Sequence, residues 1–308
     1  MKHLLLFLLF IPFILVSQTT DKKGKDIRVS PLIDGTILVP ETEGKPILAI
    51  LIGGSGPTDR NGNQSMMKNN SLRFLAEGLY DKGIAVFRYD KRIIKQLKDR
   101  TFTEETVRFD DFIKDANDVI AFFKRSKAFS KIVVIGHSQG SLVGMIAAQN
   151  KVDGFISIAG AGQEIDDVIV DQIALQSPGL KDNARTAFDD LRANGIALNY
   201  SPGLASIFRP EIQPFIISWM KYNPQVEIAK LQMPVLIING EKDLQVQVAE
   251  AEKLKEAFPD ATFEIIPLMN HIFKQIDGDD IDNSKTYNEP NRPVMPELIN
   301  IISDFIKK

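Results

Sequence analysis

Residues 131–140 read Lys-Ile-Val-Val-Ile-Gly-His-Ser-Gln-Gly, and this stretch decides the fold. Its apolar part predicts a buried strand, and the run 141–149 that follows is compatible with a helix. Two glycines allow the backbone to turn sharply from the strand into the helix. Such a turn presents the side chain of Ser138 at the carboxyl edge of the sheet, where ligands bind in open α/β sheets. We therefore predict that Ser138 is a nucleophile and that the Gln139 backbone amide, at the helix start, donates to an oxyanion.

The rest of the chain alternates short apolar runs with longer amphipathic stretches. Near-continuous apolar runs indicate buried parallel strands, and their alternation with helices indicates a wound sheet. A hairpin is expected at 26–40, with its turn at Asp34 and Gly35. The further strands are expected at 47–52, 84–88, 132–135, 154–159, 235–238 and 262–266, and the helices at 70–82, 109–124, 249–257 and 296–306. The predicted fold class is α/β, with a mostly parallel central sheet flanked by helices.

Residues 161–232 interrupt this rhythm, because no strand is expected there. The interval contains helical pieces punctuated by prolines and is far longer than a crossover helix requires. Its apolar side chains, among them Ile207, Phe215 and Trp219, argue against the alternative of a crossover helix with a long disordered loop. We therefore expect a helical cap, inserted into a single domain that covers residues 18–308.

Residues 1–17 are predicted to be a signal peptide. A lysine follows the first methionine, residues 4–16 are all apolar or proline, and small or polar residues come next. The apolar run is shorter than the about 20 residues of a membrane span, although a retained anchor is the alternative. We expect export to the periplasm or the medium, with no stable membrane insertion once the leader is removed.

A serine hydroxyl needs a base to take its proton, and the chain has three histidines. His3 leaves with the leader. His137 is held beside Ser138 in the turn, and its direction makes it unsuited to act as the base. Elimination therefore assigns the base to His271, which follows the last expected strand.

The base needs an acid that orients it and stabilises its charged form. Asp243 comes after the expected strand 235–238, which places it at the same sheet edge as Ser138. Glu241 is the competing candidate, but it is nearer the strand end and is expected in the turn. We predict Ser138, Asp243 and His271 as a catalytic triad, in the chain order serine, acid, histidine.

The glycine-rich loop 53–63 follows the third expected strand, 47–52. Its glycines let backbone amides approach a ligand, and the amide of Ser55 is our candidate for the second oxyanion donor. A phosphate-binding loop is excluded because the Lys-Ser/Thr ending is missing. The charged segment 87–92 follows an expected strand. It is expected to form structural ion pairs, and the alternative is that it lines the floor of the site. The acidic segment 277–282 lacks the spaced ligands of a calcium loop and is expected to be a solvated loop.

Composition excludes several classes of protein. The net charge is −3 and no basic block is present, so a nucleic-acid partner is not expected. The sequence has no cysteine, which excludes disulfides, thiol catalysis and cysteine-based metal sites. No metal or organic cofactor is expected, and the partner is a small-molecule acyl substrate. The sequence does not indicate an oligomeric state.

With these segments together, the chain resembles the α/β-hydrolase superfamily, and it looks closest to the bacterial serine-hydrolase group labelled S33-aminopeptidase-like, which includes esterases. The resemblance runs from about residue 27 to the end and is carried by the segments 53–62, 88–92, 136–140, 234–243 and 270–271. It implies the triad and the two oxyanion amides named above. The chain departs from the relatives at Ile93, where a glycine is common, and this affects the expected shape of that loop.

The expected function is hydrolysis of carboxylic esters through an acyl-enzyme on Ser138. Activity is expected to fall on acidification, as His271 takes up a proton. A peptidase, amidase or thioesterase with the same triad is one alternative, and acidic residues at Glu164, Asp166 and Asp167 are candidates to bind a substrate amine. A non-catalytic binding protein on the same scaffold is the alternative from another class.

Overall fold

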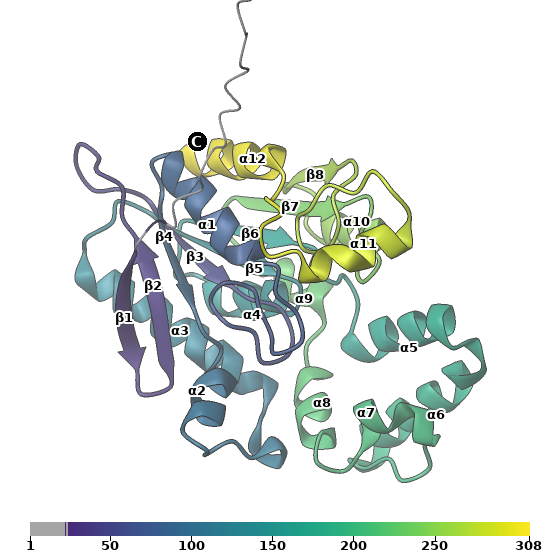
Figure 1. The fold of residues 1–308 in the computed structure, drawn as a ribbon. Helices are drawn as coiled ribbons and strands as arrows, with labels where there is room; N and C mark the ends of the chain where they lie inside the picture. Colours follow the sequence, from purple (N-terminus) through teal and green to yellow (C-terminus); the bar gives the residue numbers. More distant parts are fainter. Residues whose placement is uncertain (1–21, 23) are drawn as a thin grey trace, which may run out of the picture.

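Eight strands form one sheet in the order β1-β2-β4-β3-β5-β6-β7-β8 (Figure 1). The first pairings, of β1 with β2 and of β2 with β4, are antiparallel, and all the others are parallel. The computed structural model describes residue 22 and residues 24–308, so the predicted signal peptide lies outside the described residues. The strands are β1 Lys25–Ser30, β2 Ile33–Leu38, β3 Leu48–Ile52, β4 Ala85–Tyr89, β5 Ile132–His137, β6 Gly154–Ile158, β7 Val235–Gly240 and β8 Thr262–Ile266.

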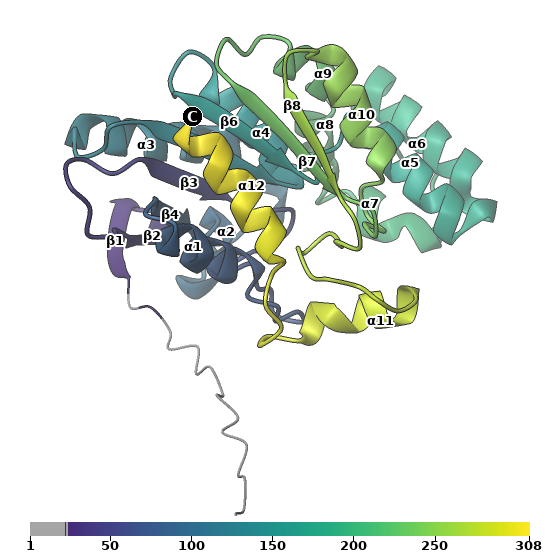
Figure 2. The same ribbon diagram turned by 90° about the horizontal axis from the view of Figure 1, so that it is seen from above.

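Helices cover both faces of the sheet, because its central strands are apolar on both sides (Figure 2). On one face lie α1 and α12, and on the other lie α3, α4, α9 and α10. Each face has its own hydrophobic core. These helices are α1 Ser71–Asp81, α3 Phe109–Ser126, α4 Gln139–Ala148, α9 Pro224–Ile228, α10 Val248–Ala257 and α12 Pro296–Lys307.

The first hairpin forms, but the expectation of a turn at Asp34 and Gly35 was wrong. The turn is at Pro31 and Leu32, and Asp34 and Gly35 lie inside β2. Gly35 has a packing role there. A Cβ at this position would lie 2.3 Å from the Phe87 ring on the neighbouring strand. The glycine therefore marks a close approach of two strands.

Outside the cap interval, two helices occur where no helix was expected. Helix α2, Arg92–Lys98, begins shortly after β4. Helix α11, Asp280–Lys285, begins within the acidic segment 277–282 that was expected to be a loop. The Asp279 side chain accepts hydrogen bonds from the amides of Ile281 and Asp282 and so caps α11. Short 3₁₀ helices lie at Glu104–Thr106, Pro178–Leu180, Pro202–Leu204 and Thr286–Asn288.

Only helices and loops connect β6 to β7. Helices α5 to α8 lie beside the sheet and form a layer of their own, and α9 returns the chain to it (Figure 1). This layer of helices α5 to α8, which we call the cap, has a separate hydrophobic core. The core includes Phe188, Leu191 and Phe208. Its helices are α5 Ile165–Gln176, α6 Lys181–Asn194, α7 Ala205–Phe208 and α8 Gln213–Trp219. Within the described residues, no helix is long and apolar enough to cross a membrane.

Candidate active site

Ser138 lies at the sharp turn between β5 and α4. Its backbone has φ 54° and ψ −124°, a conformation that strains a residue with a side chain. The flanking glycines make the turn possible: a Cβ on Gly136 would lie 2.3 Å from the Gly140 carbonyl oxygen, and a Cβ on Gly140 would lie 2.3 Å from that of Ile52. Among the described residues the Ser138 hydroxyl has no hydrogen-bond partner. The strained turn thus presents a free hydroxyl.

Asp243 and His271 are brought together from the loops after β7 and β8. The His271 Nδ1 donates to the Asp243 Oδ2 at 2.7 Å, and both side chains are buried. The other carboxylate oxygen of Asp243 accepts the amides of Gln245 and Val246 at 2.8 and 2.9 Å. With the proton on Nδ1, the Nε2 of His271 is left as a proton acceptor. Glu241 instead accepts the amide of Leu268, in the turn after β7.

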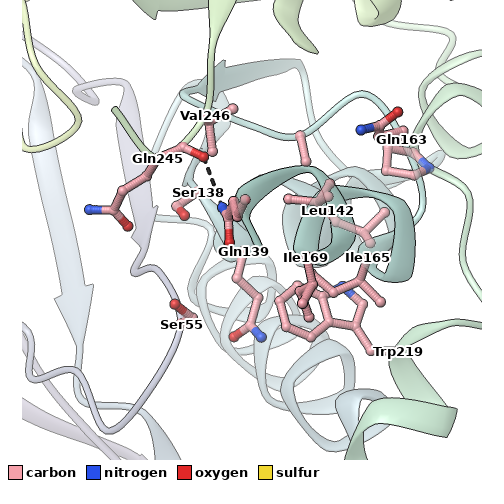
Figure 3. Close-up of a pocket in the computed structure, with 14 residues that line it drawn as sticks. Ser55, Ser138, Gln139, Leu142, Gln163, Ile165, Ile169, Trp219, Gln245 and Val246 are labelled. Carbon is pink, nitrogen blue, oxygen red and sulfur yellow. Dashed lines mark hydrogen bonds between the residues drawn. The ribbon is translucent and has the colours of Figure 1, made fainter. Parts of the chain in front are cut away.

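Ser138 borders two cavities. The first, which we call the loop cavity, measures about 190 Å³ and is lined by Ser138, His271 and Ser55, together with residues from the loop after β3. The second, which we call the cap cavity, measures about 230 Å³ and is lined by Ser138 and Ser55 with residues of α4, α5 and α8 (Figure 3). All three triad candidates and the Ser55 loop therefore converge on the same sheet edge. Ser138 and His271 both border the loop cavity. Among the described residues, the Ser138 hydroxyl and the His271 ring are not hydrogen-bonded to each other.

His137, next to the nucleophile candidate, is tied to the backbone of His271. Its Nε2 donates to the His271 carbonyl oxygen at 2.9 Å, and the two ring centroids are 4.8 Å apart. Burial, followed by the charge of His271, lowers the pKa of His137 to about 3. His137 is therefore neutral near pH 7, and it holds the His271 loop rather than serving as a base.

Lys91 is a buried amine beneath the Ser55 loop. Its Nζ donates to the Gly54 carbonyl oxygen at 2.8 Å and to the side-chain oxygen of Gln139 at 2.6 Å. It also lies 4.2 Å from the centroid of the Phe112 ring. Burial lowers the pKa of Lys91 to about 7, and the Asp115 carboxylate offsets part of this effect. One ammonium group thus connects the Ser55 loop with the first residue of α4.

The rest of the segment 87–92 has the structural role that was expected. Asp90 pairs with Arg60 of the loop after β3 at 2.6 Å, and Arg92 pairs with Asp115 of α3 at 2.7 Å. Lys91 is the exception, because it reaches the site. Lys91 fits the alternative for this segment, in which it lines the floor of the site. The contact of His137 with His271 was not predicted, because it has no local sequence signal.

The acidic residues at the start of α5 are paired within the protein. Asp166, which is 1% exposed, accepts Arg185 at 2.6 Å and Arg192 at 2.8 Å. Glu164 also accepts Arg192, and Asp167 accepts Arg185. None of the three acids lines either cavity. Within residues 24–308, no cluster of three or more histidine, aspartate or glutamate side chains could hold a metal ion.

The chain is similar in sequence to a curated protein and similar in fold to solved structures. The chain is 30% identical to esterase EstD of Thermotoga maritima over 241 residues, which are 74% of this chain and 54% of that relative. The chain thus spans about half the length of the curated relative it matches. No family model matches the chain.

Among solved structures, Est1E from Butyrivibrio proteoclasticus aligns with a TM-score of 0.58 and 17% identity, and the alignment covers 92% of this chain and 99% of Est1E. An acylaminoacyl peptidase from Pyrococcus horikoshii aligns with a TM-score of 0.54 and 13% identity, over 94% of this chain and 42% of the peptidase. At these identities the similarity concerns the fold alone, and it confirms the predicted fold class.

Proposed function

We propose that this chain, which has the α/β-hydrolase fold, is a serine hydrolase that cleaves carboxylic esters through an acyl-enzyme on Ser138. The observation that carries the proposal is the convergence of three groups at one sheet edge. A strained serine with a free hydroxyl borders the same cavity as a histidine whose Nδ1 is bound by a buried aspartate. The 30% identity to a protein named as an esterase supports the same reaction.

In this reaction His271 takes the proton of the Ser138 hydroxyl through Nε2 as the oxygen attacks the acyl carbonyl carbon. Asp243 stabilises the resulting imidazolium, and His271 then gives the proton to the leaving alcohol oxygen. The oxyanion is bound by the amides of Ser55 and Gln139. The Gln139 amide suits this role because it belongs to the first turn of α4, where N–H groups have no intrahelical partner. Water then attacks the acyl carbonyl carbon and gives a proton to His271. The bond from this carbon to the Ser138 oxygen breaks, and His271 returns the proton to that oxygen as the carboxylic acid leaves.

Replacement of the nucleophile tests the proposal. Ser138→Ala is expected to lower kcat on p-nitrophenyl butyrate by at least about 1,000-fold, because the covalent step is lost. It should also abolish labelling by a fluorophosphonate probe. Ser126→Ala, an exposed serine at the end of α3, is the matched control and should hydrolyse the ester at the wild-type rate. Wild-type activity in Ser138→Ala would exclude this mechanism, and absence of probe labelling in the wild type would favour a binding protein.

The peptidase alternative has less support from the geometry. An aminopeptidase needs an acidic group that binds the substrate amine, and the three acids of the cap are neutralised by Arg185 and Arg192. We expect simple esters to be cleaved at least ten times faster than the matching aminoacyl amides, because the amide leaving group is poorer and no residue compensates for this. Paired assays of esters, amides and thioesters with the same acyl group measure the difference.

We further propose that the protein is exported. The support is the composition of residues 1–17, where a lysine follows the first methionine and residues 4–16 are all apolar or proline. N-terminal sequencing of the protein from a fractionated native host tests this. A mature chain that begins close to residue 18 in the periplasm or medium supports export, and an intact leader on cytosolic protein contradicts it.

A further inference from the structure

The two cavities that meet at Ser138 differ in chemistry. Polar and apolar groups share the lining of the loop cavity about equally, and its polar groups are neutral. They include the side chains of Thr58, Gln64, Asn69, Ser71 and Tyr287. The cap cavity is lined mainly by apolar groups, which include the side chains of Leu142, Ile165, Val168, Ile169 and Trp219. Because the linings differ, each cavity suits a different half of an ester substrate.

His271 decides which half belongs in which cavity. The leaving alcohol oxygen must receive its proton from the imidazole that took the proton of the nucleophile. His271 lines the loop cavity and does not line the cap cavity. The alcohol half therefore lies in the loop cavity, and the acyl half lies in the cap cavity. This assignment rests on the proposed function.

The loop cavity presents unused hydrogen-bonding groups. Among the described residues, the hydroxyl of Ser71 and the side-chain amide NH₂ of Asn69 have no partner, although each residue is only 2% exposed. The Tyr287 hydroxyl accepts Gln245 Nε2 at 2.6 Å, and its own proton is left to donate. Unsatisfied polar groups at a nearly buried position are expected to meet a polar ligand or water.

The lining of the loop cavity carries no fixed charge. No aspartate, glutamate, lysine or arginine lines it, and His137 beside it is neutral because burial lowers its pKa to about 3. A charged alcohol such as choline, or a phosphorylated one, would lose hydration there without gaining an opposite charge. Mixed donors and acceptors without charge match a group that carries several hydroxyls.

The cap cavity sets the acyl half. Its apolar side chains from α4, α5 and α8 gather on one side of Ser138, and the amides of Gln163 and Gln245 lie at its edges (Figure 3). Its volume of about 230 Å³ is below the roughly 300–1,000 Å³ of sites that hold drug-sized ligands. The cavity therefore suits a short apolar acyl chain.

We propose that the substrate is an ester of a short apolar acyl group with an uncharged polyhydroxy alcohol, such as a sugar or glycerol. The loop cavity binds the hydroxyls of the alcohol, and the cap cavity binds the acyl chain. A third cavity of about 370 Å³, lined by Ile93, Leu97 and Phe215 among others, is also apolar, but Ser138 does not line it. It therefore serves as a control for the acyl assignment.

The first experiment compares four butyrate esters as substrates of the purified enzyme without residues 1–17. The alcohols are methyl glucoside, glycerol, 1-butanol and choline. We expect kcat/KM for at least one of the two polyol esters to exceed that for both the butyl and the choline ester by at least tenfold. A higher rate for the glucoside or for the glycerol ester identifies which polyol is preferred within the proposed class. Equal or better use of butyl or choline butyrate overturns the inference.

The second experiment removes groups from each cavity. Tyr287→Phe and Ser71→Ala are expected to reduce the ratio of kcat/KM for the polyol ester to that for butyl butyrate by at least threefold. Tyr80→Phe, which removes a hydroxyl on α1 outside both cavities, should leave the ratio at its wild-type value. A ratio unchanged in both loop-cavity variants overturns the role of the loop cavity.

A larger side chain in the cap cavity tests the position of the acyl half. Val168→Phe narrows the cap cavity and is expected to shift the preferred p-nitrophenyl ester to a shorter acyl chain, whereas Val107→Phe, in the third cavity, should leave the preference unchanged. The reverse result overturns the acyl assignment.

If the enzyme cleaves p-nitrophenyl butyrate through Ser138 but has no polyol preference, only this inference fails. If it cleaves no ester, the proposed function itself fails.

Discussion

Lys91 shows how one buried side chain fixes the direction of a backbone donor. In a trans peptide the carbonyl and the following N–H point in opposite directions, so holding the Gly54 carbonyl oxygen also fixes the direction of the Ser55 amide. The same ammonium group holds the side chain of Gln139, whose amide is the other proposed oxyanion donor. Lys91 is thus a positioning residue beneath the loop and not a group that contacts substrate.

Lys91→Met is expected to lower kcat by about tenfold or more and to change KM little, because oxyanion binding matters chiefly in the transition state. Steady-state kinetics on p-nitrophenyl butyrate measure the two constants. Lys98→Met, an exposed lysine on α2, is the control and should behave as the wild type. A rise in KM with kcat unchanged would contradict a positioning role.

His137 makes the stability of the fold sensitive to acid. The unfolded chain binds a proton at this imidazole near its ordinary pKa of 6.5, whereas the folded chain does so only near 3. The unfolded state therefore binds more protons between these values, and the free energy of unfolding falls as the pH falls through this range. The histidine contributes no such dependence above about pH 7.

His137→Gln keeps a donor for the His271 carbonyl but cannot be protonated. The loss of unfolding free energy between pH 7.5 and 5 is expected to be smaller than in the wild type, by up to about 2 kcal/mol. Urea titrations at the two pH values measure this difference. An equal pH dependence in variant and wild type would show that His137 is not the group responsible.

The residues of the site were predictable to different degrees. Ser138 has a local sequence signal, and His271 follows from the small number of histidines. The Lys91–Gly54 contact joins residues 37 apart, and the His137–His271 contact joins residues 134 apart. No local pattern encodes such contacts, because they depend on how the strands are ordered in the sheet.

At the scale of elements, Asp166 connects two helices of the cap. It lies at the start of α5 and accepts two arginines from α6. Burial raises its pKa, but the hydrogen bonds from Arg185 and Arg192 outweigh burial, so the pKa lies below its ordinary value. The carboxylate is therefore charged near pH 7 and holds both arginines in place.

Asp166→Ala is expected to destabilise the cap by roughly 1–3 kcal/mol, because two arginines lose their buried partner while remaining partly in contact with water. Hydrogen exchange of residues 165–194 should become faster, with little change in the strands of the sheet. Asp189→Ala removes an exposed partner of Arg185 and is the control, with only a slight expected effect. Equal exchange in Asp166→Ala and the wild type would contradict this role.

The strands of the sheet and the helices of ten or more residues were well predicted. The errors occur where local signals compete. Asp34 and Gly35 have the typical sequence of a hairpin turn, but Gly35 is needed inside β2 to accommodate the Phe87 ring. Helices α2 and α11 are short, at seven and six residues, and short helices carry little periodicity.

At the scale of the whole molecule, the cap and the sheet have separate cores. Leu298 of α12 is fully buried in the core on one face of the sheet, and Phe188 of α6 is fully buried in the core of the cap. A substitution in the first core disturbs the packing of the sheet, whereas one in the second disturbs the helices that line the cap cavity. The two cores therefore contribute to different properties.

Leu298→Ala is expected to lower the free energy of global unfolding by about 2–5 kcal/mol, the usual cost of truncating a buried leucine. Phe188→Ala is expected to change global unfolding less but to raise KM, because the cap that lines the acyl side becomes looser. Urea unfolding and steady-state kinetics on both variants separate the two effects. A larger global loss in Phe188→Ala than in Leu298→Ala would show that the cap and sheet unfold as one unit.

The connection between β6 and β7 has a further consequence for folding. The two strands are neighbours in the sheet, yet the whole cap lies between Ile158 and Val235. The entropy of closing a chain segment grows only with the logarithm of its length, so roughly 75 residues cost about 1.4 kcal/mol more than a crossover of about 15. Because this cost is small, the sheet tolerates large exchanges of sequence between these two strands. The acyl preference can therefore be re-engineered by grafting a different cap at this junction while the strands that hold Ser138, Asp243 and His271 keep their pairing.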